Sequence, residues 1–287
     1  MPAVPTFFQW DDHEVINNRS TATNLSADDR YKEKSVRLLS ARAGRAFHEM
    51  TPIRHTPAEP GRVYRKIAYG PLRDVFFVDL RSSRGANSEN MESVLTPDSR
   101  ILGEDQLRWL KQALAVSRAT WKILASDKPI GLIDWSDGPN TFEGISNNDD
   151  GPPRGRELEI AELLSFIKHA GVQNVVWLTA EVHYTASHYY DPSHAAFQDF
   201  EPFWEFVSGP IHAGTFGPAQ LDHTFGPEVR FQKAPRPDQP QNLPPSAGLQ
   251  FFGIVEIDGA TEMMTVRLMD RDDNQLFTQQ IAPQGMA

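Results

Sequence analysis

Two short stretches of this sequence carry residue types that could perform chemistry. The first is Asp11-Asp12-His13-Glu14, which follows a mostly apolar segment and precedes two asparagines. An aspartate here could supply a hard oxygen ligand, and the histidine could donate a proton to a leaving oxygen. Glu14 could fix the orientation of the imidazole ring, as carboxylates behind a catalytic or ligating histidine do. A solvated acidic turn with a capping aspartate explains the same four residues, and it is the better explanation of the motif taken alone.

The second stretch is Glu181-Val182-His183, which comes just after the apolar run Val175–Leu178. Such a run, following a helix, fits a strand that is buried on both faces. Residues two apart in an extended segment point to the same side, so Glu181 and His183 would present a carboxylate and an imidazole together. These groups can ligate one metal ion, although the pair alone is ambiguous.

Three other residues are candidates with ordinary alternatives. Arg84 follows the apolar run that ends at Leu80, and it could clamp a phosphate or be a surface arginine. Asp127 could be a ligand, but a turn residue before Pro129 fits it better. His188 precedes two tyrosines, and residues in such a stretch more often pack than bind ligands.

The functional interpretation gains weight because three separate apolar runs end in such residues. In open α/β sheets, ligands bind where the strands end at their carboxyl edge. Two metal ions about 3.5–4 Å apart, held by ligands from several strand ends, can clamp the attacking and leaving oxygens of a phosphoryl transfer. We therefore expect Asp12, His13, Glu181 and His183 to converge on one site.

The remaining sequence predicts the elements that must position these residues. Apolar residues spaced by three and four predict helices, and short apolar runs between turn-forming residues predict strands. The expected helices cover 31–50, 102–116 and 157–169; the expected strands cover 4–9, 62–69, 73–80, 120–125, 175–178, 203–208, 249–257, 263–268 and 275–281; long loops cover 135–154 and 209–247. This order predicts a layered α/β domain with three antiparallel strands at its end.

The composition of the chain limits its partners and the kinds of site it can form. The chain has 287 residues and a formal net charge of −10, which argues against nucleic acid or an anionic membrane as the main partner. It has no cysteine, which excludes disulfides and cysteine-based zinc sites. The sequence contains no apolar run long enough for a signal peptide or membrane span. Because a dense polar motif stands so near Met1, we expect the sequence to begin part-way into a larger unit.

The chain resembles the PhoD-like alkaline phosphatases of the calcineurin-like metallophosphoesterase superfamily. The resemblance runs over nearly the whole chain and rests on motifs at 10–18, 77–84, 102–110, 155–157, 179–188 and 203–210, of which the first and fifth are specific. It implies one PhoD-like metallophosphatase domain over 1–287, a layered α/β/β/α sandwich that lacks its N-terminal strands. It also implies hydrolysis of small-molecule phosphate mono- or diesters and export from the cytoplasm, often by the twin-arginine route.

The resemblance assigns roles to individual residues. Asp12-His13-Glu14 matches a superfamily motif, Asn-His-Glu/Asp, that places a metal ligand beside a catalytic histidine. Glu181-Val182-His183 matches a later motif with two metal-binding residues. The implied set is therefore His13 and Glu14 for catalysis, with Asp12, Glu181 and His183 for metal. PhoD-like members are associated with iron and calcium, and other superfamily members with zinc, manganese or iron pairs.

Arg84 and His188 complete the expected site as substrate-binding residues, and two departures from the family bear on it. Many relatives carry aspartate where this chain has Glu181, and the longer side chain moves the carboxylate outward. A Gly-Asp-x-x-Tyr-x-Asp motif, which supplies the aspartate that bridges the metals, does not occur in this sequence. We therefore expect weak or no esterase activity from this chain without a missing N-terminal half. An inactive fragment and a non-catalytic cation-binding module are the alternatives.

Overall fold

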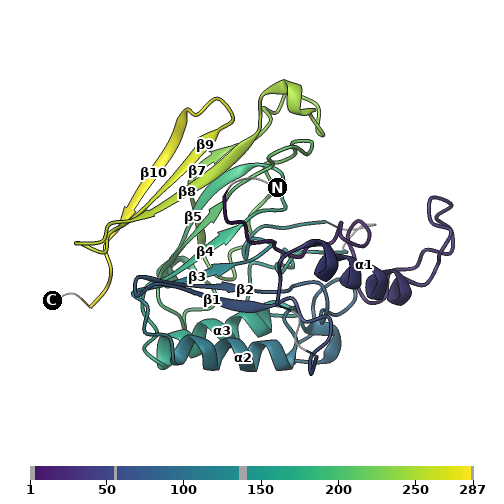
Figure 1. Ribbon diagram of the computed structural model, residues 1–287, viewed down its shortest axis with the longest axis horizontal. Helices are drawn as coiled ribbons and strands as arrows, with labels where there is room; N and C mark the ends of the chain where they lie inside the picture. The colour runs from purple at the N-terminus through teal and green to yellow at the C-terminus, as the bar shows by residue number, and fades with distance from the viewer. Residues whose placement is uncertain (1–3, 55–56, 136–140, 286–287) are drawn as a thin grey trace.

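The computed structural model of the chain describes residues 4–54, 57–135 and 141–285 (Figure 1). Its helices are α1 (Val36–Met50), α2 (Glu104–Ala115) and α3 (Glu157–His169), with 3₁₀ turns at Pro97–Ser99, Pro192–His194 and Pro245–Ala247. Its strands are β1 (Arg65–Tyr69), β2 (Arg73–Phe77), β3 (Trp121–Ala125), β4 (Val175–Thr179), β5 (Thr185–Tyr190), β6 (Phe203–Val207), β7 (Pro227–Lys233), β8 (Phe251–Ile257), β9 (Met264–Asp270) and β10 (Gln275–Ile281). All three predicted helices are confirmed. α1 begins later than predicted because Ser35 caps it, with its hydroxyl accepting a 3.3 Å bond from Leu38 N.

The strands form two sheets. The larger has seven strands in the order β1-β2-β3-β4-β6-β5-β7, and its central strands β2, β3, β4 and β6 are parallel. The predicted strands at 120–125 and 175–178 are neighbours in it, with Ile123 opposite Val176. The smaller sheet has the order β10-β9-β8 and is antiparallel, which confirms the prediction for the last three strands.

Neighbouring side chains of the central strands pack in two separate cores, one on each face of the large sheet. Leu124 on β3 and Trp177 on β4 pack in a cluster with residues of α2 and α3. Ile123 and Val176 pack in a second cluster with residues of β9, such as Val266. Because both faces are covered, most residues of these strands are apolar. Figure 1 shows the resulting layers, with α2 and α3 below the large sheet and the small sheet on its other side.

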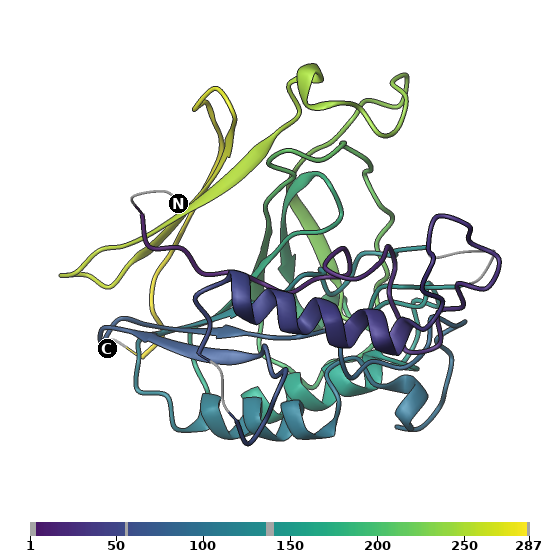
Figure 2. The same ribbon diagram turned by 45° about the vertical axis from the view of Figure 1, so that its right-hand side comes forward.

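The layered α/β architecture is thus confirmed, and α1 lies outside these layers. Figure 2 shows α1 running beside the large sheet, near the N-terminal segment. Phe47 of α1 packs with Trp10 and Val63 in a small core of its own. In neither view does a helix of the described residues cover the outer face of the small sheet. Within these same residues, no helix combines the length and apolar character needed to cross a membrane.

One predicted strand is absent, and two strands of the structure were not predicted. Residues 4–9 join no sheet: Arg65 Nη2 donates to Phe8 O over 2.6 Å, so a side chain and not a backbone ladder holds this segment. β5 was not predicted, because Thr185, Ser187 and His188 are polar residues that the structure nevertheless buries. β7 lies in the predicted loop 209–247. Pro227 argued against a strand there, but β7 pairs along one edge only, and an edge strand tolerates proline. Residues 136–140 of the predicted loop 135–154 lie outside the described part of the chain.

Candidate functional site

Charged side chains gather at the carboxyl ends of the parallel strands β2, β3 and β4. Arg81 follows β2, Asp127 and Lys128 follow β3, and Glu181 follows β4. Ala180 N donates to Asp127 O over 3.1 Å, which joins the last two strand ends directly. This edge is where an open α/β sheet binds its ligands.

Two other segments reach the same edge. The N-terminal motif contributes Asp11, whose Oδ1 accepts bonds of 2.7 and 3.0 Å from Arg81 Nη2 and Nε. Asp12 follows it and begins a tight turn, because Ile16 N donates to Asp12 O over 2.9 Å. The loop after β3 contributes Glu143, whose carboxylate contacts Arg81 Nη1. Residues from five segments therefore meet here.

Arg81 is the centre of this group and is completely buried. Besides Asp11 and Glu143 it binds Asp127 Oδ2 over 2.9 Å, and Glu181 Oε1 lies 3.6 Å from its Nη2. Burial acts to lower the pKa of Arg81, but these carboxylates raise it well above its usual value. The guanidinium of Arg81 binds carboxylates of the protein and is not free to clamp a phosphate.

Lys128 is the second buried cation of the site. Its Nζ lies 2.8 Å from Glu181 Oε2 and 3.3 Å from Glu143 Oε2, and it also contacts Asp134. Burial acts to raise the pKa of Glu143, but Lys128 and Arg81 outweigh it and hold that pKa at about 2. Glu143 is therefore a carboxylate at any neutral pH.

Three carboxylates of the site fit a metal ion. One oxygen each from Asp12, Glu143 and Glu181 lies within 4.8 Å of the other two. Ligands on opposite sides of a hard cation stand about 4–5 Å apart, twice the bond length of roughly 2.0–2.6 Å. Asp12 is 1% exposed; its Oδ2 accepts a 2.6 Å bond from Asn18 N, while its Oδ1 is buried with no hydrogen-bond partner. A buried carboxylate oxygen without a partner is costly, and a cation would satisfy it.

The N-terminal motif places His13 beside this group. Its Nε2 lies 4.0 Å from Asp12 Oδ2, and its side chain is 71% exposed. The ring can therefore meet a molecule that approaches the carboxylates from solvent. Glu14 does not orient this ring as expected, because its Oε2 accepts a 2.8 Å bond from Asp11 N and so closes the turn.

The second motif has a different backbone from the one predicted. Glu181 and His183 have φ angles of 64° and 62°, in the left-handed region, and Val182 N bonds to Ala180 O over 2.8 Å. The segment is a turn, so the argument that an extended strand aligns the two side chains is wrong. Glu181 nevertheless joins Asp12, as expected, whereas the three-oxygen group does not include His183. His183 Nδ1 lies 2.6 Å from Gly214 O, and as a donor to that carbonyl it leaves Nε2 free to ligate.

Arg84 is buried beside the site and is not the surface residue of the alternative interpretation. Its Nη2 donates to Asn87 Oδ1 over 2.9 Å and to Glu143 O. Its Nε and Nη1 are buried with no hydrogen-bond partner. Burial, with Arg81 close by, lowers the pKa of Arg84 to about 10. A role in binding an anion remains a prediction.

His188 does not belong to the site. It lies on β5 with no exposed surface, and its Nδ1 is 3.0 Å from Glu205 Oε2. Tyr190 OH donates to the same oxygen over 2.8 Å, and Ile130 N donates to the other carboxylate oxygen over 2.8 Å. His188 is thus one donor to a buried carboxylate, and this placement does not support the expectation that it binds substrate.

This placement predicts the effect of His188→Ala. The free energy of unfolding should fall by about 3–5 kcal/mol, because the variant removes a partner from the buried Glu205. Urea unfolding measures this, and KM for a phosphate ester should stay within roughly twofold of the parent value. His169→Ala is the control, since His169 pairs with Asp199 at the surface and should change little. A large rise in KM with unchanged stability would instead show that His188 helps to bind substrate.

Sequence reasoning missed two central residues, Glu143 and Lys128. The signal for Glu143 was its context: it stands between the buried residues Phe142 and Ile145 in an otherwise polar loop. Lys128 stands beside Asp127 directly after a buried strand, and no role was predicted for it. Both pairings join residues far apart in sequence, so no local pattern reveals them.

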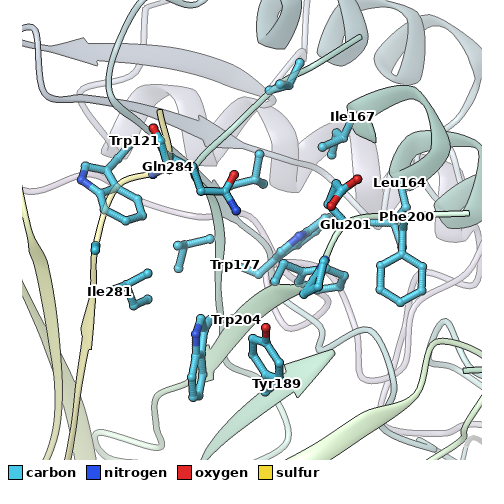
Figure 3. Close-up of a pocket in the computed structure, with 17 residues that line it drawn as sticks. Trp121, Leu164, Ile167, Trp177, Tyr189, Phe200, Glu201, Trp204, Ile281 and Gln284 are labelled. Carbon is cyan, nitrogen blue, oxygen red and sulfur yellow. The ribbon is translucent and has the colours of Figure 1, made fainter. Parts of the chain in front are cut away.

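An aromatic pocket of about 140 Å³ lies elsewhere in the molecule (Figure 3). Residues that line it include Trp121, Tyr189, Trp177, Trp204, Ile281 and Gln284. Trp121 and Phe203 begin β3 and β6, so the pocket lies at the amino ends of the strands. The charged site lies at the carboxyl ends, and the pocket is therefore separate from it.

The chain is similar to known proteins in both sequence and fold. A family model described as PhoD-like phosphatase matches residues 1–268. The alkaline phosphatase D of Bacillus subtilis (strain 168) is 31% identical over 191 residues, which cover 63% of this chain and 31% of the Bacillus protein. A solved structure of PhoD matches with a TM-score of 0.57 at 20% identity, covering 96% of this chain and 55% of that chain. At this identity the structural match shows the fold alone, and the chain spans about a third and about half of the two relatives.

Proposed function

The chain belongs to the PhoD-like phosphatase family, and from this membership we propose that it hydrolyses small phosphate esters at a metal-dependent site around Asp12. One observation carries the proposal. Asp12 Oδ1 is a buried carboxylate oxygen without a hydrogen-bond partner, and Asp12 contributes one oxygen to a group with oxygens of Glu143 and Glu181. This group lies at the carboxyl edge of a parallel sheet, beside an exposed histidine.

Asp12, Glu143 and Glu181 would hold the metal, with His183 Nε2 as a further ligand. The bound ion would polarise a phosphoryl oxygen and lower the pKa of a bound water. Oxygen ligands suit calcium, magnesium and manganese, and an added imidazole suits iron and zinc. We keep iron and calcium as the first proposal, from the family resemblance, with zinc or manganese as alternatives.

His13 is proposed as the group that gives a proton to the leaving oxygen. Its exposed ring stands beside Asp12, where it can meet the ester on the solvent side of the carboxylates. The Arg84 guanidinium is proposed to attract the phosphate, since its Nε and Nη1 have no partner. The substrate is a small mono- or diester, and the proposed location, from the family resemblance, is outside the cytoplasm.

The second candidate function is a cation-binding module without catalysis. One observation favours it: Arg81 and Lys128 already bind the carboxylates of Glu143 and Glu181. Such a group could bind a cation while leaving too few free ligand positions for a substrate. The two functions differ in whether bound metal brings turnover.

The test is a metal-removal experiment on the purified chain. After treatment with a chelator, turnover of p-nitrophenyl phosphate and bis-p-nitrophenyl phosphate is measured with iron, calcium, zinc or manganese restored singly. We expect turnover only with metal, and a loss of about 10²-fold or more in Asp12→Asn, because losing even a group behind a ligand costs about 10–100-fold.

The control is Asp28→Asn, which changes a partly exposed aspartate paired with Arg30 outside the site. It should match the parent chain. Metal binding without turnover would favour the cation-binding module, and turnover that survives complete metal removal would refute the proposed function.

A further inference from the structure

Lys128 occupies an unusual position for a lysine. Its side chain is 1% exposed, and its Nζ is surrounded by carboxylates of Glu181, Glu143 and Asp134. An ammonium group has three N–H donors and no acceptor, so three carboxylates satisfy it completely. Burying an unpaired lysine is costly, so the three carboxylates are what allows Lys128 to lie in the interior.

The backbone holds Lys128 at this position. Ser126 Oγ donates to Lys128 O over 3.1 Å, and Ala180 N donates to Asp127 O over 3.1 Å. The lysine therefore follows directly from the end of β3, where the parallel sheet fixes the chain. Its side chain reaches toward the end of β4, where Glu181 stands.

The ammonium shares its ligands with the candidate metal group. Glu143 and Glu181 contact Lys128 and also contribute oxygens to the group with Asp12. Among the described residues, the Asp12 carboxylate pairs with His13, at 4.0 Å, and with no lysine or arginine. Glu143 and Glu181, which Arg81 also contacts, thus lie between the ammonium group of Lys128 and the carboxylate of Asp12.

This is the arrangement of a two-cation centre in which a lysine supplies one cation. In two-metal sites the ions stand about 3.5–4 Å apart and share ligands between them. Resting on the proposed function, we propose that Lys128 is the resident cation of this site. Its ammonium takes the carboxylate oxygens that a second metal ion would use, and the chain holds one metal ion, at Asp12.

The test compares manganese stoichiometry in Lys128→Met with that in the parent chain. Methionine keeps an unbranched side chain of similar length and removes the charge. After equilibration with excess Mn²⁺ and removal of free ion, elemental analysis should give one manganese per parent chain and two per Lys128→Met chain. The paramagnetic resonance spectrum should show two coupled Mn²⁺ ions in the variant only.

Two matched variants control this experiment. Lys122→Met removes another largely buried lysine, near the opposite end of the same strand, and should still bind one ion. Lys128→Arg keeps the charge and should also bind one. If Lys128→Met does not fold without metal, folding is followed while Mn²⁺ is added: recovery with two ions bound supports the proposal, and failure to recover overturns it.

The outcomes separate this inference from the proposed function. Two ions in the parent chain, or one in a folded Lys128→Met, would refute the role of Lys128 while leaving a metal-dependent phosphatase intact. A parent chain that binds no manganese, iron, calcium or zinc would overturn both.

Discussion

Replacing His13 with alanine should lower the turnover number for a small phosphate ester by about 10²–10⁴-fold, the usual contribution of a general acid or base. The reason is position: the ring is exposed and its Nε2 lies 4.0 Å from the buried carboxylate of Asp12. The variant loses the proton donor but no metal ligand. Its metal content and free energy of unfolding should therefore match the parent chain.

Steady-state kinetics with p-nitrophenyl phosphate checks this prediction, with metal content measured on the same samples. A leaving group with a low pKa needs less help from a proton donor, so the defect should grow as the leaving alcohol becomes more basic. His194→Ala is the control, because His194 is a half-exposed histidine paired with Glu228 on a different part of the surface. Equal defects in the two variants, or none in His13→Ala, would remove His13 from the mechanism.

The second large effect is expected in Arg81→Met. Arg81 binds Asp11, Asp127 and Glu143 in the interior, and its loss removes a cation from all three carboxylates. Breaking one buried pair costs about 3–5 kcal/mol, so the free energy of unfolding should fall by at least that amount. Arg108→Met, which breaks an exposed pair on α2, should leave stability nearly unchanged.

The sign of the pH dependence makes this prediction specific. In the parent chain the pKa of Glu143 is about 2, below its usual value, because of Lys128 and Arg81. A lowered folded-state pKa gives stability that is present above the unfolded pKa and is lost as pH falls toward 2. In Arg81→Met these carboxylates lose one of their cations, so their folded-state pKa values should rise. Acid should therefore narrow the difference in unfolding free energy between variant and parent. Urea unfolding with chelator present at pH 8 and pH 5 tests this, and a gap that widens at pH 5 would contradict it.

The sequence allowed much of the fold to be predicted because its central elements bury continuous apolar surface. α3 was placed to the residue, since its apolar positions repeat with helical spacing and a glycine follows its end. β5 and β7 were missed because their burial depends on neighbours far away in sequence. Thr185 and Ser187 are fully buried on β5, although neither residue type predicts a core position.

The sequence predicted site residues only where reactive side chains follow an expected strand. Asp12 and Glu181 were brought together by that reasoning, and the structure places them in one group. Lys128 and Glu143 were not found, because ion pairs between separate strand ends and a loop leave no local pattern. The role of His188 was misjudged for a related reason: its partner Glu205 lies on another strand, and only the sheet pairing brings them together.

The central claim is that a metal ion binds at Asp12, within the group formed with Glu143 and Glu181. Anomalous diffraction from crystals of the chain grown with Mn²⁺ tests it most directly. We expect an anomalous peak at bonding distance from Asp12 Oδ1, roughly 2.0–2.6 Å for a hard cation and oxygen. The peak should vanish in Asp12→Asn. A chain that hydrolyses phosphate esters with manganese, yet shows its peak away from Asp12, would contradict the claim.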